Sequence, residues 1–245
     1  MVAQSIAPAI APVVLLTRPA AQSARFAESL WARAPWAQIV TCPLIAPRFL
    51  TPDLPIAPWE AVILSSETGA LAAGRMKQGL PDLAYCVGDR TAQAARQAGF
   101  TTLSAQGDAE DLLALILSQP VAPLLHLRGR EARGGLAQRL SASGIETTEA
   151  VVYAQEAQRL TAKAAHLLQG PDPVLVPLFS SRSAEILVEE CLRVGSKAPL
   201  TVVAMSSAVA VAAAPLSARM MIANQPTGET MLEVVVKHMI AGLGA

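Results

Sequence analysis

The chain has 245 residues, of which 52% are hydrophobic and 16% charged, and 19 Lys and Arg balance 19 Asp and Glu. This length suits one large α/β domain or two of roughly 100 to 150 residues each, with ample apolar material for their cores. The zero net charge removes the electrostatic footprint of a nucleic-acid-binding protein, so we expect no nucleic acid as a partner.

The first residues do not resemble a targeting segment. No Lys or Arg precedes Arg18, and the longest strongly apolar stretch before it is VVLL at 13–16. A signal peptide needs a basic start and a longer apolar core, and no window reaches the ~18 apolar residues that span a membrane. We therefore expect a loose Ala/Pro segment over 1–12, no membrane association, and a cytoplasmic, monomeric protein.

Short apolar runs alternate with helix-like stretches along the rest of the chain. Strands are predicted at 12–17, 61–66, 83–88, 124–129, 174–181, 200–206 and 218–223. Helices are predicted at 21–34, 89–99, 108–119, 132–143, 181–195 and 227–244. Continuous apolar strands separated by helices are typical of parallel sheets covered on both faces, so the predicted fold class is α/β.

Three blocks of the first half recur in the second half in the same order. The matched pairs are ILSSETGALAA (63–73) with LFSSRSAEILVEE (178–190), VGDRTAQAARQAG (87–99) with VAMSSAVAVAAAP (203–215), and GDAEDLLALIL (107–117) with PTGETMLEVVV (226–236). A single match would be chance in an alanine-rich chain. Three in register predict two copies of one α/β unit.

Two extended runs, at 38–47 and 147–157, interrupt this pattern. The simplest layout inserts one domain into the other, with a pair of linker strands as a hinge and a cleft between two lobes. The predicted bounds are 1–38 and 158–245 for domain one, 46–148 for domain two, and 39–45 and 149–157 for the linker strands.

Hydroxyl side chains cluster where predicted strands end and helices begin. Ligands bind at the carboxyl ends of strands in open parallel sheets, and a helix N-terminus attracts carboxylates or phosphates. The candidate binding residues are Arg18, Ser65, Ser66, Gly88, Thr91, Arg128, Ser180, Ser181, Ser206 and Ser207. Each Ser or Thr can instead be a helix N-cap, and each arginine an ordinary surface residue, so both interpretations stay open.

Tyr153 is one of only two tyrosines and lies in the second extended run, where a phenol could donate a proton or could merely pack. The three histidines share no metal-ligand spacing, and His126 is expected to be a strand residue with a satisfied ring. The three cysteines, Cys42, Cys86 and Cys191, form no C-x-x-C pair and are expected to be buried small hydrophobes. G-x-S-x-G and the phosphate-binding glycine motifs are absent.

The motifs LLTRP, VILSS, VGDRTA, LHLRGRE, VVY, LFSSRSAEIL and QPTGETMLEVV follow one another over nearly the whole chain after residue 12. In order and spacing they resemble the uroporphyrinogen-III synthase family. The resemblance implies two flavodoxin-like domains joined by a two-stranded linker. It also implies a cofactor-free reaction that closes the linear tetrapyrrole hydroxymethylbilane into uroporphyrinogen III, with inversion of ring D and loss of water. Transient contact with hydroxymethylbilane synthase is a further expectation.

The resemblance also implies roles for single residues. Tyr153 matches the family's linker tyrosine, which assists loss of the substrate's hydroxyl, and Thr91 matches the threonine of a glycine-x-x-threonine-alanine turn. Further matches are Ser180 and Ser181 with a threonine-serine pair, Ser207 with the threonine of the second turn, and Pro226 and Thr227 with a proline-threonine pair. Ala204 replaces a usual glycine, and we expect it to tighten the second turn.

Other classes of protein share parts of this pattern. A non-enzymatic, hinged two-lobe anion-binding protein would have the same fold, although such proteins usually carry a signal peptide. A nucleotide-dependent α/β enzyme would need a phosphate-binding loop, which the sequence lacks. A regulatory domain without activity is a third alternative. The predicted function is that of a uroporphyrinogen-III synthase.

Overall fold

The computed structural model describes residues 12–54, 57–119, 121–132 and 134–241, so the predicted loose segment lies outside the described residues except for Pro12. The chain divides into two compact units. Unit 1 comprises Met1–Ala46 and Ala157–Ala245, and unit 2 comprises Pro47–Glu156. Unit 2 is therefore an insertion in the sequence of unit 1.

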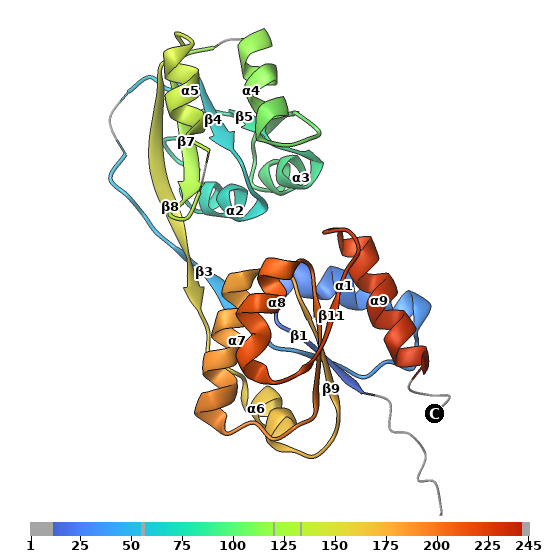
Figure 1. Ribbon diagram of the computed structural model, residues 1–245. Coiled ribbons are helices and arrows are strands. Elements are labelled where there is room, and N and C mark those ends of the chain that lie inside the picture. The colour runs from blue at the N-terminus through green and yellow to red at the C-terminus, as the bar shows by residue number, and fades with distance from the viewer. Residues whose placement is uncertain (1–11, 55–56, 120, 133, 242–245) are drawn as a thin grey trace, which may run out of the picture. The chain divides into compact units, whose positions relative to one another are not determined.

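Unit 1 is a five-stranded parallel sheet with helices on both faces (Figure 1). Its strand order is β11-β10-β9-β1-β2. Along β9, Leu175 packs into the core cluster with α1 and α9, while Val174 and Val176 pack with α6, α7 and α8. The elements are β1 Val13–Leu16, α1 Ala20–Arg33, β2 Ile39–Thr41, α6 Ala162–Gln169, β9 Val174–Leu178, α7 Ser181–Val194, β10 Leu200–Ala204, α8 Ser207–Ala213, the 3-10 helix Ala214–Leu216, β11 Arg219–Ile222 and α9 Gly228–Ala241.

Unit 2 is built around a six-stranded sheet of order β3-β8-β7-β4-β5-β6, in which β4 to β8 pair in parallel. One core cluster packs the sheet against α2 and α3, and another packs it against α4 and α5. The elements are β3 Ile45–Phe49, β4 Ala61–Leu64, α2 Glu67–Arg75, β5 Leu83–Cys86, α3 Asp89–Gln97, β6 Thr101–Ser104, α4 Ala109–Ser118, β7 Leu124–Gly129, α5 Leu136–Ala142 and β8 Thr147–Ala157.

The two sheets have the same strand order once a change of chain connection is allowed for. Reading β8-β7-β4-β5-β6 beside β2-β1-β9-β10-β11 pairs the strands one to one. Both correspond to the flavodoxin-like order 2-1-3-4-5, with the two starting strands supplied last in unit 2. This topology supports the repeat predicted from the sequence. In this strand order β1 of unit 1 corresponds to β7 of unit 2, a pair that the sequence repeat did not include.

The predicted strands and helices agree with the structure to within a few residues, but several elements were not assigned. β6 reads TTLS and has only one strongly apolar residue, and α6 is a short helix of eight residues. The predicted linker strands also differ. Residues 39–41 pair with β1 inside the sheet of unit 1, and 149–156 belong to the sheet of unit 2. All three cysteines are buried and unpaired, as expected.

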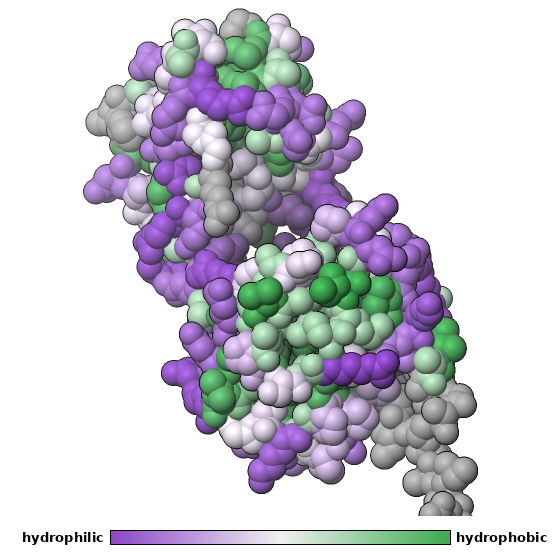
Figure 2. Space-filling model, in the orientation of Figure 1, coloured by the Kyte–Doolittle hydropathy of each residue, from purple (hydrophilic) through white to green (hydrophobic). Residues whose placement is uncertain are grey.

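Two surface properties complete this description. Among the described residues no helix is long and apolar enough to cross a membrane. Unit 1 exposes the large apolar side chains Leu192 and Val211, each 74% accessible. Figure 2 shows apolar residues gathered over α8 on this face of unit 1.

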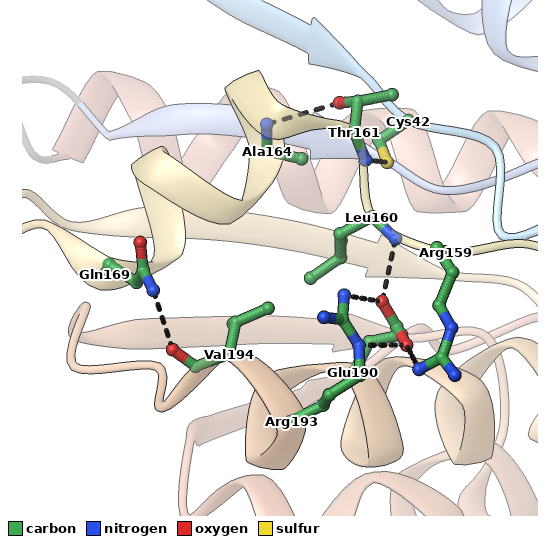
Figure 3. A network of polar contacts seen from close by, with 9 residues as sticks. All are labelled: Cys42, Arg159, Leu160, Thr161, Ala164, Gln169, Glu190, Arg193 and Val194. Atoms are coloured by element: carbon green, nitrogen blue, oxygen red, sulfur yellow. Dashed lines mark hydrogen bonds and ion pairs between the residues drawn. The ribbon is translucent and has the colours of Figure 1, made fainter.

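Glu190 of α7 is a buried carboxylate with both oxygens hydrogen-bonded (Figure 3). Oε1 accepts from Arg159 at 2.9 Å and Arg193 at 2.8 Å, and Oε2 accepts from Arg193 at 2.5 Å and the Leu160 N–H at 2.8 Å. The hydrogen bond from Arg193 contributes most to lowering the pKa of Glu190, which falls to about 2. Because 159 and 160 follow the second crossing of the chain into unit 1, Glu190 fixes the returning chain against α7.

We expect Glu190→Gln to lower the free energy of unfolding by ~2–3 kcal/mol near neutral pH, because the amide leaves two arginines without their counter-charge. The folded pKa lies below the unfolded one, so this stabilisation is complete above the ordinary glutamate pKa and is lost as the pH falls through it toward about 2. Urea unfolding at about pH 7 and about pH 3 measures the difference. The exposed neighbour variant Glu189→Gln is the control, and an equal loss at both pH values would contradict this account.

Candidate functional site

The carboxyl ends of the parallel strands carry the side chains predicted to bind a ligand. In unit 1 they are Arg18 after β1, Ser180 and Ser181 after β9, Ser206 and Ser207 after β10, and Pro226 and Thr227 after β11. In unit 2 they are Ser65 and Ser66 after β4, Gly88 and Thr91 after β5, Arg128 at the end of β7, and Tyr153 in β8. Since parallel strands end at one edge of their sheet, each group lies along one edge.

Several of these hydroxyls cap helices, so the capping alternative is confirmed for them. Ser66 accepts from the Gly69 N–H at 2.9 Å, Ser180 from the Ser183 N–H at 3.2 Å, and Ser206 from the Val209 N–H at 3.4 Å. Thr227 accepts from the Thr230 N–H at 3.1 Å. Each cap satisfies one free helical N–H, a contribution of ~1 kcal/mol.

Thr91 is not a cap. The N-cap of α3 is Gly88, and Thr91 is the third residue of the helix, only 4% exposed. Ser181 and Ser207 are the first residues of their helices, and Ser65 precedes the capping Ser66. Helix capping therefore does not account for these four hydroxyls.

The structure corrects the residue match between the two repeated turns. Gly88 and Ser206 are both N-caps and so correspond, whereas the sequence match had paired Gly88 with Ala204 and Thr91 with Ser207. Ala204 is the fully buried last residue of β10, two residues before the N-cap Ser206. Because the chain is rich in alanine, the sequence alignment that matched the most identical or small residues was shifted by two positions from the structural alignment.

Tyr153 lies against the start of α2 in unit 2. Its side chain is 9% exposed, and its hydroxyl is 2.9 Å from Ser66 Oγ. A Cβ at Gly129 would come within 2.6 Å of the Tyr153 ring, so a residue without a side chain is needed at the end of β7. A register shift between Arg128 and Gly129 sets Gly129, rather than Arg130, opposite Tyr153. The ring is thus held by the backbone of one strand and the cap of one helix.

A second polar chain begins at the neighbouring serine. Ser65 Oγ is 3.2 Å from Nε2 of His126, and His126 Nδ1 is 3.5 Å from Oε1 of Glu149. Glu149 Oε2 accepts from Arg128 Nε at 2.9 Å, and Arg128 also donates to the Gly129 carbonyl at 3.0 Å. His126 is 3% exposed. Burial lowers the pKa of His126 below its ordinary value and the Glu149 carboxylate partly opposes this, so the ring is neutral near pH 7.

This arrangement differs in part from what the sequence predicted. His126 is a buried strand residue, as expected, but only its Nε2 is hydrogen-bonded, and Nδ1 has no partner at normal hydrogen-bond length. A cavity of about 150 Å³ adjoins His126, Arg128 and Glu149. Arg128, for which the sequence left both an anion contact and a surface role open, donates to Glu149 and to the Gly129 carbonyl.

Unit 1 has a simpler edge at the corresponding strands. The guanidinium of Arg18 stacks on the ring of Phe179, 3.9 Å from its centroid. When β1 is set beside β7, Leu16 takes the place of His126, and β2, the counterpart of β8, has only three residues and no tyrosine. The phenol and imidazole of this site therefore belong to unit 2.

A larger cavity of about 630 Å³ lies in unit 1, at the other ends of β1 and β2, lined by Val13, Ile39, Lys163, His166 and others. It contains none of the predicted site residues. The Lys163 and His166 side chains that line this cavity are exposed to solvent, unlike the buried His126 of unit 2.

Sequence reasoning missed three contributors to the site in unit 2, namely His126, Glu149 and Gly129. His126 and Arg128 alternate along β7 and so share one face, a signal readable in LHLRG, but Glu149 enters only through the pairing of β7 with β8. Gly129 was noted only as a neighbour of Arg128. Its contact with Tyr153 depends on the register shift, for which the sequence gives no signal.

We expect Gly129→Ala to displace the Tyr153 ring and to destabilise the protein by ~1–3 kcal/mol, because the added methyl group collides with buried ring atoms. NMR of the protein with labelled tyrosine should show one shifted ring signal, since the chain has only two tyrosines. Gly228→Ala, whose Cβ meets nothing within 4 Å, is the control. An unshifted Tyr153 signal would show that the contact does not hold the ring.

Comparison with known proteins gives one family and several solved structures. The profile of the family described as "Uroporphyrinogen-III synthase HemD" matches residues 25–233. Comparison with curated proteins gives no significant match. The structure of uroporphyrinogen-III synthetase from Helicobacter pylori is similar, with a TM-score of 0.62 and 17% identity over 93% of this chain and 99% of that one. A mutant uroporphyrinogen-III synthase from Thermus thermophilus matches with a TM-score of 0.44 and 14% identity over 94% and 99% of the two chains.

Proposed function

The chain belongs to the uroporphyrinogen-III synthase family, a family of cyclising lyases of haem biosynthesis, and from this we propose how it closes hydroxymethylbilane into uroporphyrinogen III. The reaction inverts ring D and releases water. The observation that supports our assignment of the chemistry is the hydrogen bond between Tyr153 and Ser66 at the carboxyl edge of unit 2. The phenol thus lies beside the N-terminus of α2 and the hydroxyl of its capping serine.

In the first step Tyr153 is the acid. Ser66 Oγ accepts the Gly69 N–H, which leaves its own proton free for the oxygen of Tyr153. When Ser66 donates to Tyr153, the phenol proton points away from Ser66 and can pass to the hydroxyl that leaves the substrate as water. The C–O bond breaks, and the hydroxymethylpyrrole becomes an electrophilic azafulvene.

The remaining task is positional. In free solution the azafulvene closes head to tail and gives the uninverted isomer, so the enzyme must direct attack by the substituted carbon of the last ring. The substrate carries many carboxylates, and the helix N-termini at both sheet edges offer backbone N–H groups to such anions. Candidate contacts are Arg18, Gly88, Thr91, Ser180, Ser181, Ser206, Ser207, Pro226 and Thr227.

Thr91 and Ser181 are favoured among these contacts. Neither caps its helix, so helix stability alone does not explain their hydroxyls, and the same is true of Ser207. A cytoplasmic location and a monomeric state are parts of the same proposal. Transient contact with hydroxymethylbilane synthase is also proposed, and the exposed apolar residues Leu192 and Val211 mark the surface of unit 1 on which to test it.

A coupled assay tests the function directly. Hydroxymethylbilane synthase generates the substrate in situ, and the protein is added. The products are then oxidised, and the uroporphyrin isomers are separated by chromatography. We expect mainly isomer III. Isomer I alone from folded protein would remove the proposed function and favour a hinged anion-binding protein without activity.

We expect Tyr153→Phe to lower kcat by ~100-fold or more, because it removes the acid that the leaving hydroxyl needs. Tyr85→Phe is the matched control: Tyr85 is also buried, but its hydroxyl donates to the carbonyl of Gln119, the C-cap of α4, which is not a site residue. Unfolding measurements on both variants separate chemistry from stability. Unchanged kcat in Tyr153→Phe would remove the catalytic role of the phenol.

A further inference from the structure

Two adjacent serines after β4 belong to two different hydrogen-bonded chains. Ser66 is bonded to a phenol, Tyr153, and Ser65 is bonded to an imidazole, His126. A phenol is a proton donor, and a neutral imidazole nitrogen is a proton acceptor. The end of one strand therefore holds an acid and a base on neighbouring residues, and the mechanism above uses only the acid.

The direction of the hydrogen bonds that link Ser65, His126 and Glu149 follows from the Glu149 carboxylate. Oε1 of the Glu149 carboxylate lies 3.5 Å from His126 Nδ1, longer than a normal hydrogen bond, and a carboxylate can only accept a proton donor. The charge of this carboxylate favours a ring proton on Nδ1 over one on Nε2, and a proton on Nδ1 leaves the Nε2 lone pair for the hydroxyl proton of Ser65. Ser65 Oγ then offers its own lone pairs outward and acts as a hydrogen-bond acceptor.

An outward acceptor suits one part of a tetrapyrrole in particular. Carboxylates need donors, so Ser65 held in this way is a poor partner for them, whereas a pyrrole N–H needs an acceptor. Ser65 is half-buried at the edge of the sheet, while His126 behind it is closed off from solvent. Of these two residues, Ser65 is the one that can touch a substrate.

We propose that Ser65, backed by His126 and Glu149, is the base of the reaction and takes the N–H proton of the pyrrole ring that loses its hydroxyl. This inference rests on the function proposed above. The pyrrole N–H bond breaks, its proton passes to Ser65 Oγ, and the Ser65 proton passes to His126 Nε2. Together with the proton that Tyr153 gives to the leaving hydroxyl, the step removes one water and leaves a neutral azafulvene.

As the C–O bond breaks, the pyrrole becomes cationic and its N–H strongly acidic, so a weak base is sufficient. Burial, and to a smaller extent Arg128, lower the pKa of His126 to about 4, so the ring is a weak base. The Glu149 carboxylate opposes this lowering and favours the imidazolium, and Arg128 holds the carboxylate in place through Oε2. The adjoining cavity of about 150 Å³ leaves Glu149 room to approach Nδ1 when the ring becomes charged. His126 and Glu149 are thus positioning and relay residues, and Ser65 is the catalytic one.

The tautomer of His126 can be measured without any substrate. The chain has three histidines, so nitrogen-15 NMR of their rings at neutral pH resolves each one, with His126→Gln assigning its signal. We expect a neutral ring protonated at Nδ1 and unprotonated at Nε2. A ring protonated at Nε2 would overturn the proposal, because it would donate to Ser65 and could not take its proton.

The kinetic test compares Ser65→Ala, His126→Gln and Glu149→Gln in the coupled assay. Gln at 126 can still accept the Ser65 hydrogen bond but cannot take up its proton, so kcat should fall by ~100-fold while KM changes little. Glu149→Gln and Ser65→Ala should act in the same way, and Glu149→Gln keeps the test available if the buried position 126 does not tolerate change. His166→Gln, the same substitution at an exposed histidine of unit 1, should leave kcat unchanged.

The two proposals fail in different ways. Wild-type protein that makes no isomer III removes the proposed function itself. Wild-type protein that makes isomer III, with His126→Gln and Ser65→Ala retaining full kcat, overturns only the base. His126→Gln could instead lose kcat only in proportion to its loss of folded protein, while Ser65→Ala stays fully active. That result would assign His126 to stability and would also overturn the role of Ser65 as the base.

Discussion

The parallel pairing of the strands is the constraint on which the rest of this protein depends. A parallel sheet requires each strand to be followed by a crossover, so every strand end lies at the same edge and most are followed by a helix N-terminus. The topology alone therefore brings free backbone N–H groups and their capping hydroxyls to this edge. Ser66, Ser180 and Ser206 are the result: stabilising caps that lie where an anionic ligand would bind.

The same topology occurs twice, but only one copy carries reactive side chains. In unit 1 the two starting strands come first in the chain and β2 is short, whereas in unit 2 they come last and β8 runs for 11 residues. Glu149 pairs with His126 where Thr41 pairs with Leu16 in unit 1, whereas Tyr153 lies on the part of β8 that has no counterpart in β2. The two sheets thus differ both in the length of this strand and in the side chains at matching positions.

The geometry around Ser65 and Ser66 connects stability with chemistry. Ser66 caps α2, and because its Oγ already accepts a backbone N–H, its proton can orient the phenol of Tyr153. Ser65 does not cap a helix and is oriented instead by a buried ring. In this scheme both serines donate to their side-chain partners, but the groups left facing outward differ: a phenol proton beside Ser66 and the lone pairs of Ser65. This difference suits a reaction that adds a proton at one atom and removes one at another.

The sequence by itself determined the fold class, most element positions, the repeat and the family, because these depend on apolar periodicity and on motif order along the chain. It also identified Tyr153 and the strand-end hydroxyls, since these follow visible strand patterns. Only the tertiary structure decided which hydroxyls are caps, that Gly88 corresponds to Ser206, and that Gly129 makes room for a phenol. It alone joined Ser65, His126 and Glu149, because their contacts are made across paired strands distant in sequence, and strand register is not written in any local pattern.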